Sequence, residues 1–126
     1  MAMNVVLDTN AVLYFLAGRL LEPLPSARFY ISFITEMELL SYPLLRAEDT
    51  AEIIDFLADV TVLELSPAIK QAAIRLRSEH RLKLPDAIIA ATALCLPAQL
   101  LSNDVKLVNL TCVSVKSLAL KDVGES

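Results

Sequence analysis

The sequence predicts an α/β fold with three layers, in which helices cover both faces of a five-stranded parallel sheet. Strand-like and helix-like segments alternate along the whole chain, which is typical of parallel strands joined by helical crossovers. The strand-like segments are short and apolar throughout, as expected for strands buried on both faces. We expect residues 1–126 to form one domain, with its core at about residues 4–115.

The first two strands are expected on either side of a helix. Residues 4–7 (NVVL) predict a buried strand, and residues 10–18 predict a helix that ends at Gly18. A loop with two prolines then leads to a second strand at 28–32.

Two helices and a third strand follow. Residues 35–46 predict a helix that is broken near Pro43, because proline lacks the amide hydrogen that the helix requires. Residues 48–60 predict a helix with acidic residues in its first turn, and residues 61–65 predict the third strand.

The last part of the chain carries two helices that begin with proline. Residues 66–81 predict a helix with Ser66 as its N-cap, and residues 84–96 predict another with proline in its first turn. The remaining elements are a strand at 99–102, a helical turn at 104–109, a strand at 112–115 and a tail from Lys116 that is expected to fray.

Composition restricts the function. The net charge is −4 and the sequence pI is about 4.9, so any binding of nucleic acid needs a local basic patch or bound cations. Hydrophobic residues make up 56% of the chain. This excess fits either a covered surface, such as a homodimer face, or simply a very apolar parallel sheet.

The sequence points to a cytoplasmic protein that does not enter a membrane. Its beginning does not resemble a signal peptide, and the longest apolar run, 87–101, is too short to span a bilayer. Cys95 and Cys112 lie in apolar segments outside any metal-binding spacing, so we expect two buried, reduced thiols.

Four carboxylates are expected at one edge of the sheet. Asp8 directly follows a predicted strand, and Asp104 follows another with Ser102 and Asn103 beside it, whereas Glu38 and Asp86 fall in the first turns of predicted helices. Sites of parallel sheets form beyond the carboxyl ends of the strands. The placement of Asp86 is less direct, because no clear strand leads into its helix.

Helix capping offers another explanation for each carboxylate. Thr35 and Glu38 fit a capping box, Asp86 suits the positive end of its helix, and the other two acids could be N-caps. Capping accounts for each acid singly, but it does not require all four to share an edge.

Four neighbouring carboxylates favour a bound cation. Two of them about 5 Å apart repel by roughly 3 kcal/mol at an effective dielectric constant of about 20. Mg²⁺ and Mn²⁺ prefer oxygen ligands and leave positions for water and phosphate, and His80 is the only histidine that a zinc site could use. The chemistry that best suits this set is metal-assisted hydrolysis of a phosphodiester.

The segments VVLDTNAVLYFL, SFITEMELLSYP, LKLPDAIIAATAL and LLSNDVKL resemble the four sequential motifs of PIN domains. The similarity is greatest to VapC-type toxins of toxin–antitoxin pairs, and it covers roughly residues 4–115. It implies a sheet order of 3-2-1-4-5, endonucleolytic cleavage of RNA with Mg²⁺ or Mn²⁺, a homodimer and an antitoxin that blocks the site.

The resemblance assigns the four metal-binding acids to Asp8, Glu38, Asp86 and Asp104. It also matches the polar positions around them, Thr9, Asn10 and Ser102. Glu36 is an alternative for the second acid, but the pair Glu38-Leu39 fits the family pattern better. Val105, Lys106 and Leu107 follow Asp104, where relatives often carry an aromatic residue.

A basic stretch precedes Asp86, and its last members, Arg81 and Lys83, are candidates for binding RNA. The alternative is that the stretch is the solvated face of an amphipathic helix.

The leading hypothesis is a metal-dependent endoribonuclease of the toxin type. A nuclease for structured or single-stranded DNA and a non-catalytic module that binds RNA or an antitoxin are the alternatives. A phosphate-transfer hydrolase with Asp8 as nucleophile is a weaker one, because Asn10 replaces the second aspartate that its motif needs.

Overall fold

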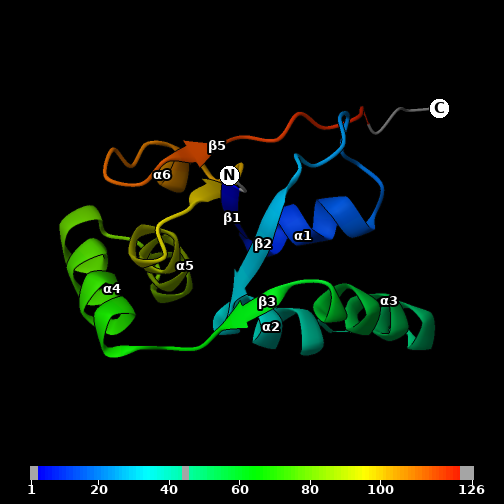
Figure 1. Ribbon diagram of the computed structural model, residues 1–126, viewed down its shortest axis with the longest axis horizontal. Coiled ribbons are helices and arrows are strands. Elements are labelled where there is room, and N and C mark those ends of the chain that lie inside the picture. Colours follow the sequence, from blue (N-terminus) through cyan, green and yellow to red (C-terminus); the bar gives the residue numbers. More distant parts are fainter. Residues whose placement is uncertain (1–2, 44–45, 123–126) are drawn as a thin grey trace.

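A parallel sheet of five strands forms the centre of the protein (Figure 1). The computed structural model describes residues 3–43 and 46–122. The strand order is β3-β2-β1-β4-β5, which confirms the predicted fold and order. The strands are β1 (Met3–Leu7), β2 (Ala27–Ser32), β3 (Thr61–Leu63), β4 (Gln99–Leu101) and β5 (Val115–Lys116). The helices are α1 (Thr9–Leu16), α2 (Phe33–Leu40), α3 (Ala47–Ala58), α4 (Pro67–His80), α5 (Leu84–Cys95) and α6 (Val105–Val108).

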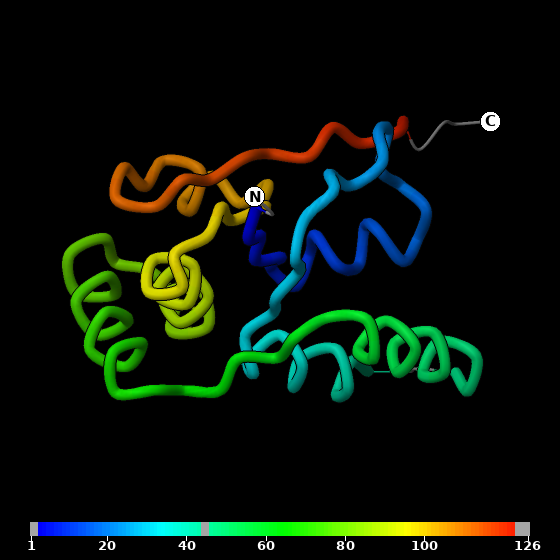
Figure 2. Tube along the Cα trace, in the orientation of Figure 1, coloured from blue at the N-terminus to red at the C-terminus, as the bar shows by residue number. Residues whose placement is uncertain are grey.

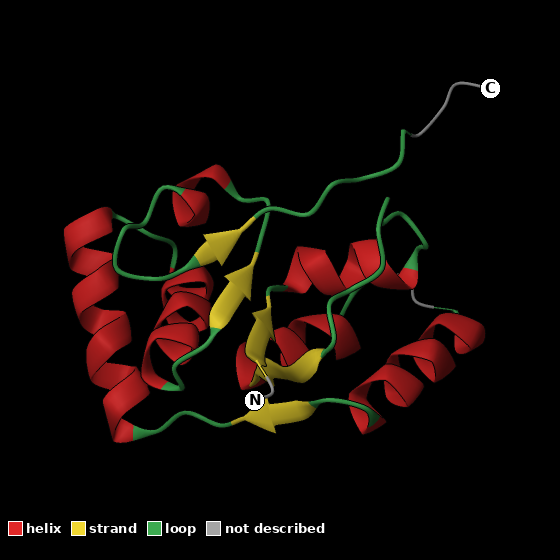
Figure 3. Cartoon of the chain, turned by 45° about the horizontal axis from the view of Figure 1, so that its top comes forward, coloured by secondary structure: helices red, strands yellow, loops and turns green. Residues whose placement is uncertain are grey.

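Successive residues of the central strands enter different layers. Val5 and Leu7 of β1 pack in one core cluster with side chains of α1, α2 and α3, whereas Val6 packs in the other with α4, α5 and α6. Leu100 and Leu101 of β4 divide in the same way. Figure 3 shows the helices on both sides of the strands. This period of two, with both faces apolar, explains why the strands read as continuous hydrophobic runs.

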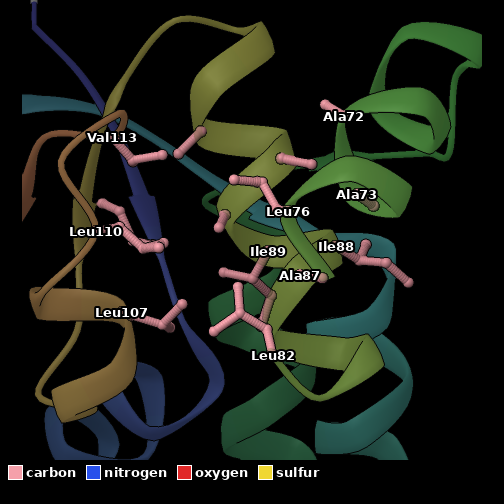
Figure 4. Close-up of a cluster of buried hydrophobic side chains, with 14 of the residues drawn as sticks. Ala72, Ala73, Leu76, Leu82, Ala87, Ile88, Ile89, Leu107, Leu110 and Val113 are labelled. Carbon is pink, nitrogen blue, oxygen red and sulfur yellow. The ribbon is translucent and has the colours of Figure 1, made fainter. Parts of the chain in front are cut away.

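The pair α4 and α5 forms the more extensive of the two helical layers. Small alanines let the helices approach closely, and Leu76 and Leu82 fill the space beside Ala87 and Ile89 (Figure 4). Residues 87–93 of α5 are all buried, so this helix is a central support of the fold. Its N-terminal turn is thereby fixed against the sheet.

Two predicted elements differ from the structure by three residues or more at one end. The helix expected at 35–46 begins at Phe33, because the hydroxyl of Ser32 accepts the Ile34 amide and caps it there. It ends at Leu40, and residues 44 and 45 of the expected range lie outside the described residues. The strand expected at 112–115 is β5, Val115–Lys116, because Leu110 and Val113 are taken up by the core before pairing with β4 begins.

The segment after Lys116 is predicted to fray, but through Lys121 it is held in place. Asn103 accepts the Leu118 amide, and Leu120 forms a bridge with Leu20. Figure 2 shows this red segment passing beside the loop that follows α1. The last four residues of the predicted tail lie outside the described residues. Gly18, at φ +69°, follows α1 as predicted.

The prediction of buried thiols was also wrong. Cys95 is the last residue of α5, beyond its buried stretch, and Cys112 lies in the loop between α6 and β5. Both are free and exposed. Among the helices of the described ranges, none combines the length and the apolar character that a membrane crossing needs.

Candidate functional site

The four predicted carboxylates line one pocket of about 340 Å³. They come from four segments that are far apart in the sequence: the ends of β1 and β4, the middle of α2 and the first turn of α5. Thr9 and Asn10 line the same pocket, as predicted, but Glu36 does not. The complete lining consists of Asp8, Thr9, Asn10, Leu13, Glu38, Ser41, Tyr42, Pro43, Asp86, Ile89 and Asp104.

Asp8 is the most deeply placed acid, with 5% of its surface exposed. Its backbone amide bonds the Leu101 carbonyl at 3.2 Å, which extends the ladder between β1 and β4 by one residue. Its Oδ1 accepts the Ala11 amide at 2.7 Å and caps α1. Asp8 therefore caps α1 and lines the pocket at the same time, and the capping hydrogen bond fixes the orientation of its carboxylate.

Asp104 has the same arrangement at the end of β4. Its Oδ1 accepts the Lys106 amide at 2.8 Å and caps α6. The buried hydroxyl of Ser102 accepts the Asp104 amide at 3.0 Å. Ser102 therefore fixes the turn between strand and helix, and its hydroxyl also opposes the rise in the pKa of Asp8 as a hydrogen-bond donor.

Glu38 is held by hydroxyl groups. The capping-box explanation was wrong, because α2 begins two residues before Thr35. Thr9 Oγ1 lies 2.5 Å from Glu38 Oε1 and 3.1 Å from Thr35 Oγ1. A carboxylate only accepts and each hydroxyl has one proton, so Thr35 donates to Thr9 and Thr9 donates to Glu38. This chain ties α1 to α2 across the pocket.

Asp86 reaches the edge although no strand leads into its helix. The turn between α4 and α5 brings the first turn of α5 to the pocket, and Pro85 in that turn suits the start of a helix. The charge of Lys83 lowers the pKa of Asp86, but burial and the charges of Asp104 and Asp8 raise that pKa by more.

Burial and mutual repulsion act on the two central acids in the same direction. Burial raises the pKa of Asp8, and the charges of Asp104 and Glu38 add to the rise. Burial also raises the pKa of Asp86, to which Asp104, Asp8 and Glu38 contribute further repulsion. The ionised forms of these acids are therefore unfavourable in the empty pocket. Binding of a cation or a proton would reduce their mutual repulsion.

The donor set fits Mg²⁺ or Mn²⁺ surrounded partly by water. All the acidic donors of the pocket are oxygen atoms, which hard cations prefer. Within residues 3–43 and 46–122, no three His, Cys, Asp or Glu side chains meet the spacing for direct binding of one ion. Mg²⁺ commonly binds proteins through one or two carboxylates and keeps several water ligands.

Several residues of the pocket were missed by sequence reasoning. Tyr42 and Pro43 form part of its wall, and Tyr42 is 49% exposed. Tyr42 follows the end of α2, where the proline suggests only a break in the helix. Thr35 lies behind the pocket and not in its wall, and its spacing in the sequence indicates only a capping residue. Its burial under Thr9 depends on contacts between α1 and α2 that local patterns do not contain.

The two basic candidates are separated. Lys83 is the N-cap residue of α5, three positions before Asp86, and it is not part of the pocket lining. Arg81 lines a different groove, together with Arg77. The two openings flank the first turn of α5, because Leu84 lines the groove and Asp86 lines the pocket.

Comparisons with solved structures find toxin–antitoxin proteins. The chain is 29% identical to a chain of a toxin–antitoxin complex from Klebsiella pneumoniae, with a TM-score of 0.74 over 86% of this chain and 94% of that one. It is 26% identical to a chain of VapBC-1 from nontypeable Haemophilus influenzae, with a TM-score of 0.73 over 91% and 98% of the two chains.

A third match shows the fold alone. A chain of VapBC2 from Rickettsia felis, bound to a fragment of its promoter DNA, has a TM-score of 0.77 at 19% identity, over 93% of this chain and all of that one. Among curated proteins, no sequence matches the chain.

The family model of the PIN domain matches residues 5–111. This range includes all four carboxylates of the pocket. The predicted resemblance to VapC-type toxins is confirmed by the match to VapBC-1. The chain belongs to the PIN domain family.

Proposed function

We propose that this protein is a divalent-metal-dependent endoribonuclease and the toxin of a toxin–antitoxin pair, acting through a single domain. The observation that carries the proposal is the meeting of four carboxylates from distant segments in one pocket. Membership of the PIN family and likeness to chains of toxin–antitoxin complexes support it.

Asp8, Glu38, Asp86 and Asp104 would hold Mg²⁺ or Mn²⁺, directly or through water. When bound, the ion supplies a lowered pKa for the attacking water and stabilisation of charge on the leaving oxygen. The chain has a separate task, which is to keep the carboxylates in place. The caps on Asp8 and Asp104 and the hydroxyl bond to Glu38 do this.

Three polar residues support the acids. Thr9 donates to Glu38, and Ser102 contacts the turn of Asp104. Asn10 is exposed at the pocket, where its amide could orient a water molecule or a phosphate oxygen. Supporting contacts of this kind commonly matter nearly as much as the metal ligands.

Single-stranded RNA suits the walls of the pocket. Lys83 offers a positive charge beside Asp86, and Tyr42 offers an exposed aromatic ring on which a base can stack. The acidic chain leaves few such positive charges elsewhere, so binding of the substrate would depend on them and on the bound ion.

An antitoxin would cover the groove beside the site. The groove is lined by apolar side chains of α1 and α3 together with Asp49 and Glu52. Leu13, Tyr42 and Pro43 line both this groove and the acidic pocket. A partner segment with apolar and basic side chains would fit the groove by charge, and would obstruct the pocket at the same time.

We also propose a homodimer in the cytoplasm. The apolar surplus remains visible at the surface, for example in Val105, Leu94 and Leu65. The two cysteines are free and exposed, a state that a reducing compartment preserves. Sedimentation of the purified chain measures its oligomeric state.

Cleavage of labelled RNA tests the main proposal. The purified protein should cut single-stranded RNA internally with Mg²⁺ or Mn²⁺, and should stop when a chelator is added. A single DNA strand of the same sequence should be tested in parallel as the competing substrate. Cleavage of DNA alone would favour a DNA nuclease, and no cleavage of either with both metals would favour a non-catalytic module.

A further inference from the structure

The positive charge of the chain is concentrated in one segment. Residues 66–83 carry five of the 11 Lys and Arg residues but one of the 15 acidic residues, a net charge of +4. The whole chain has a net charge of −4, which leaves −8 for all other residues. An anionic polymer that approaches this protein is therefore attracted mainly to α4 and the turn after it.

Two arginines of this segment face a groove. Arg77 and Arg81 line an opening of about 490 Å³ with Ser78. Its other lining residues are Ile74, Leu82 and Leu84, of which Ile74 and Leu84 are about half exposed. Arg77 lies in the last turn of α4 and Arg81 is its C-cap residue, so the end of the helix brings both positive charges to the groove. Within the described part of the chain, neither takes part in an ion pair, since both ion pairs found there belong to Arg46.

The backbone at Arg81 is in an unusual conformation. Arg81 follows the last residue of α4 with φ 55° and ψ 38°, the left-handed region, where glycine is the usual residue. It is the only residue other than glycine with a positive φ in ranges 3–43 and 46–122. An arginine at this position carries backbone strain that a glycine would avoid, and such strain commonly occurs at functional sites.

We infer that the groove of Arg77 and Arg81 binds the phosphate backbone of single-stranded RNA next to the cleavage pocket. The inference rests on the proposed function for the identity of the polymer. The two openings flank the first turn of α5, with Leu84 in one and Asp86 in the other. A strand that leaves the acidic pocket past Lys83 reaches the two guanidinium groups. The apolar walls formed by Ile74 and Leu84 suit the faces of bases.

Binding without cleavage tests the inference. Anisotropy of a short fluorescein-labelled RNA of mixed sequence would be measured in chelator over a range of salt concentrations. Arg77→Ala and Arg81→Gly should each weaken RNA binding about five-fold at about 0.1 M salt. Each should also reduce the salt slope, which is the steepness of the logarithm of the binding constant against the logarithm of the salt concentration, by about 0.7. Arg75→Ala is the matched control, because Arg75 is exposed on the same helix but does not line the groove.

Stability separates the binding role from a structural one. Arg81→Gly should raise the unfolding temperature while it weakens RNA binding, because glycine adopts the left-handed conformation freely. A lower unfolding temperature would mean that Arg81 serves the fold, and would overturn the inference. Affinity and salt slopes equal to those of Arg75→Ala, or no RNA binding by the parent protein at low salt, would also overturn it.

The proposed function can fail independently. If the protein binds RNA through Arg77 and Arg81 but never cleaves it, the inference about the groove is supported and the proposed nuclease activity is contradicted. If the protein cleaves RNA but the two variants bind and cleave like the parent, the nuclease stands and the groove does not.

Discussion

Thr9 Oγ1 donates a hydrogen bond of 2.5 Å to Glu38 Oε1, so the first residue of α1 holds an acid of α2. Thr9 in turn accepts from the fully buried hydroxyl of Thr35 at 3.1 Å. Thr9 also follows Asp8 directly in the chain. Two of the four acids are therefore placed by neighbouring residues, one through the cap of α1 and one through a hydroxyl.

Thr9→Val should remove the support of Glu38 with little change of shape. We expect cleavage of RNA to fall by about 10–100-fold, as is usual when a residue that orients a metal ligand is lost. The free energy of unfolding should fall by about 0.5–1.5 kcal/mol, the net value of one hydrogen bond. Thr9→Ser, which keeps the hydroxyl, is the control and should retain activity. Equal losses in both variants would contradict the role of the hydroxyl.

Asp8→Asn should stabilise the metal-free protein at neutral pH. The pKa of Asp8 is raised from 3.8 by burial, so the folded state binds its proton more tightly than the unfolded state. This contribution to stability is complete below the unfolded pKa and is lost as the pH rises through the folded pKa. Asparagine remains a good N-cap and carries no charge.

Thermal unfolding in chelator measures this effect. The unfolding temperature of Asp8→Asn should exceed that of the parent at neutral pH, and the difference should shrink as the pH falls to about 4. A variant that is less stable than the parent at neutral pH would show that the charge of Asp8 is satisfied without a cation.

Both cysteines should react in the folded protein. Cys95 and Cys112 are free and exposed, so a thiol reagent has access to both without unfolding. Titration with Ellman's reagent in buffer and in denaturant should give the same two equivalents. A thiol that reacts only in denaturant would contradict the exposure of that residue.

Gly18→Ala should destabilise the protein without affecting cleavage. Gly18 has a φ of +69°, and an added Cβ would meet no atom within 4 Å. The cost is therefore conformational alone, about 1–2 kcal/mol. Urea unfolding measures it. An unchanged midpoint would show that this turn relaxes to another conformation.

The parallel sheet could be predicted from the sequence because its central strands are buried on both faces. Val5, Val6 and Leu7 read as one apolar run, and the polar residues that follow them mark the edge where the site lies. Asp8 and Asp104 were predictable in this way. Asp86 needed the family motif, because its position depends on how α4 and α5 pack.

Local patterns failed where tertiary contacts decide. Thr35 and Glu38 have the spacing of a capping box, yet Ser32 caps the helix and Thr35 is buried beneath Thr9. Cys112 lies in an apolar stretch, but Leu110 and Val113 take the core positions around it. The place of Tyr42 in the pocket wall could not be predicted, because the residues next to it in the sequence do not indicate that the chain passes the pocket after α2.

Calorimetric titration of Mn²⁺ into the metal-free protein tests the central claim most directly, since it measures occupation of the acidic pocket without RNA. The parent protein should bind Mn²⁺, and Asp86→Asn should bind it at least about 10-fold more weakly while it unfolds at the same temperature or higher. Glu36→Gln, which changes an acid of α2 outside the pocket, should bind like the parent. Absence of binding to the parent, or equal affinities for parent and Asp86→Asn, would contradict the claim that these carboxylates form a metal site.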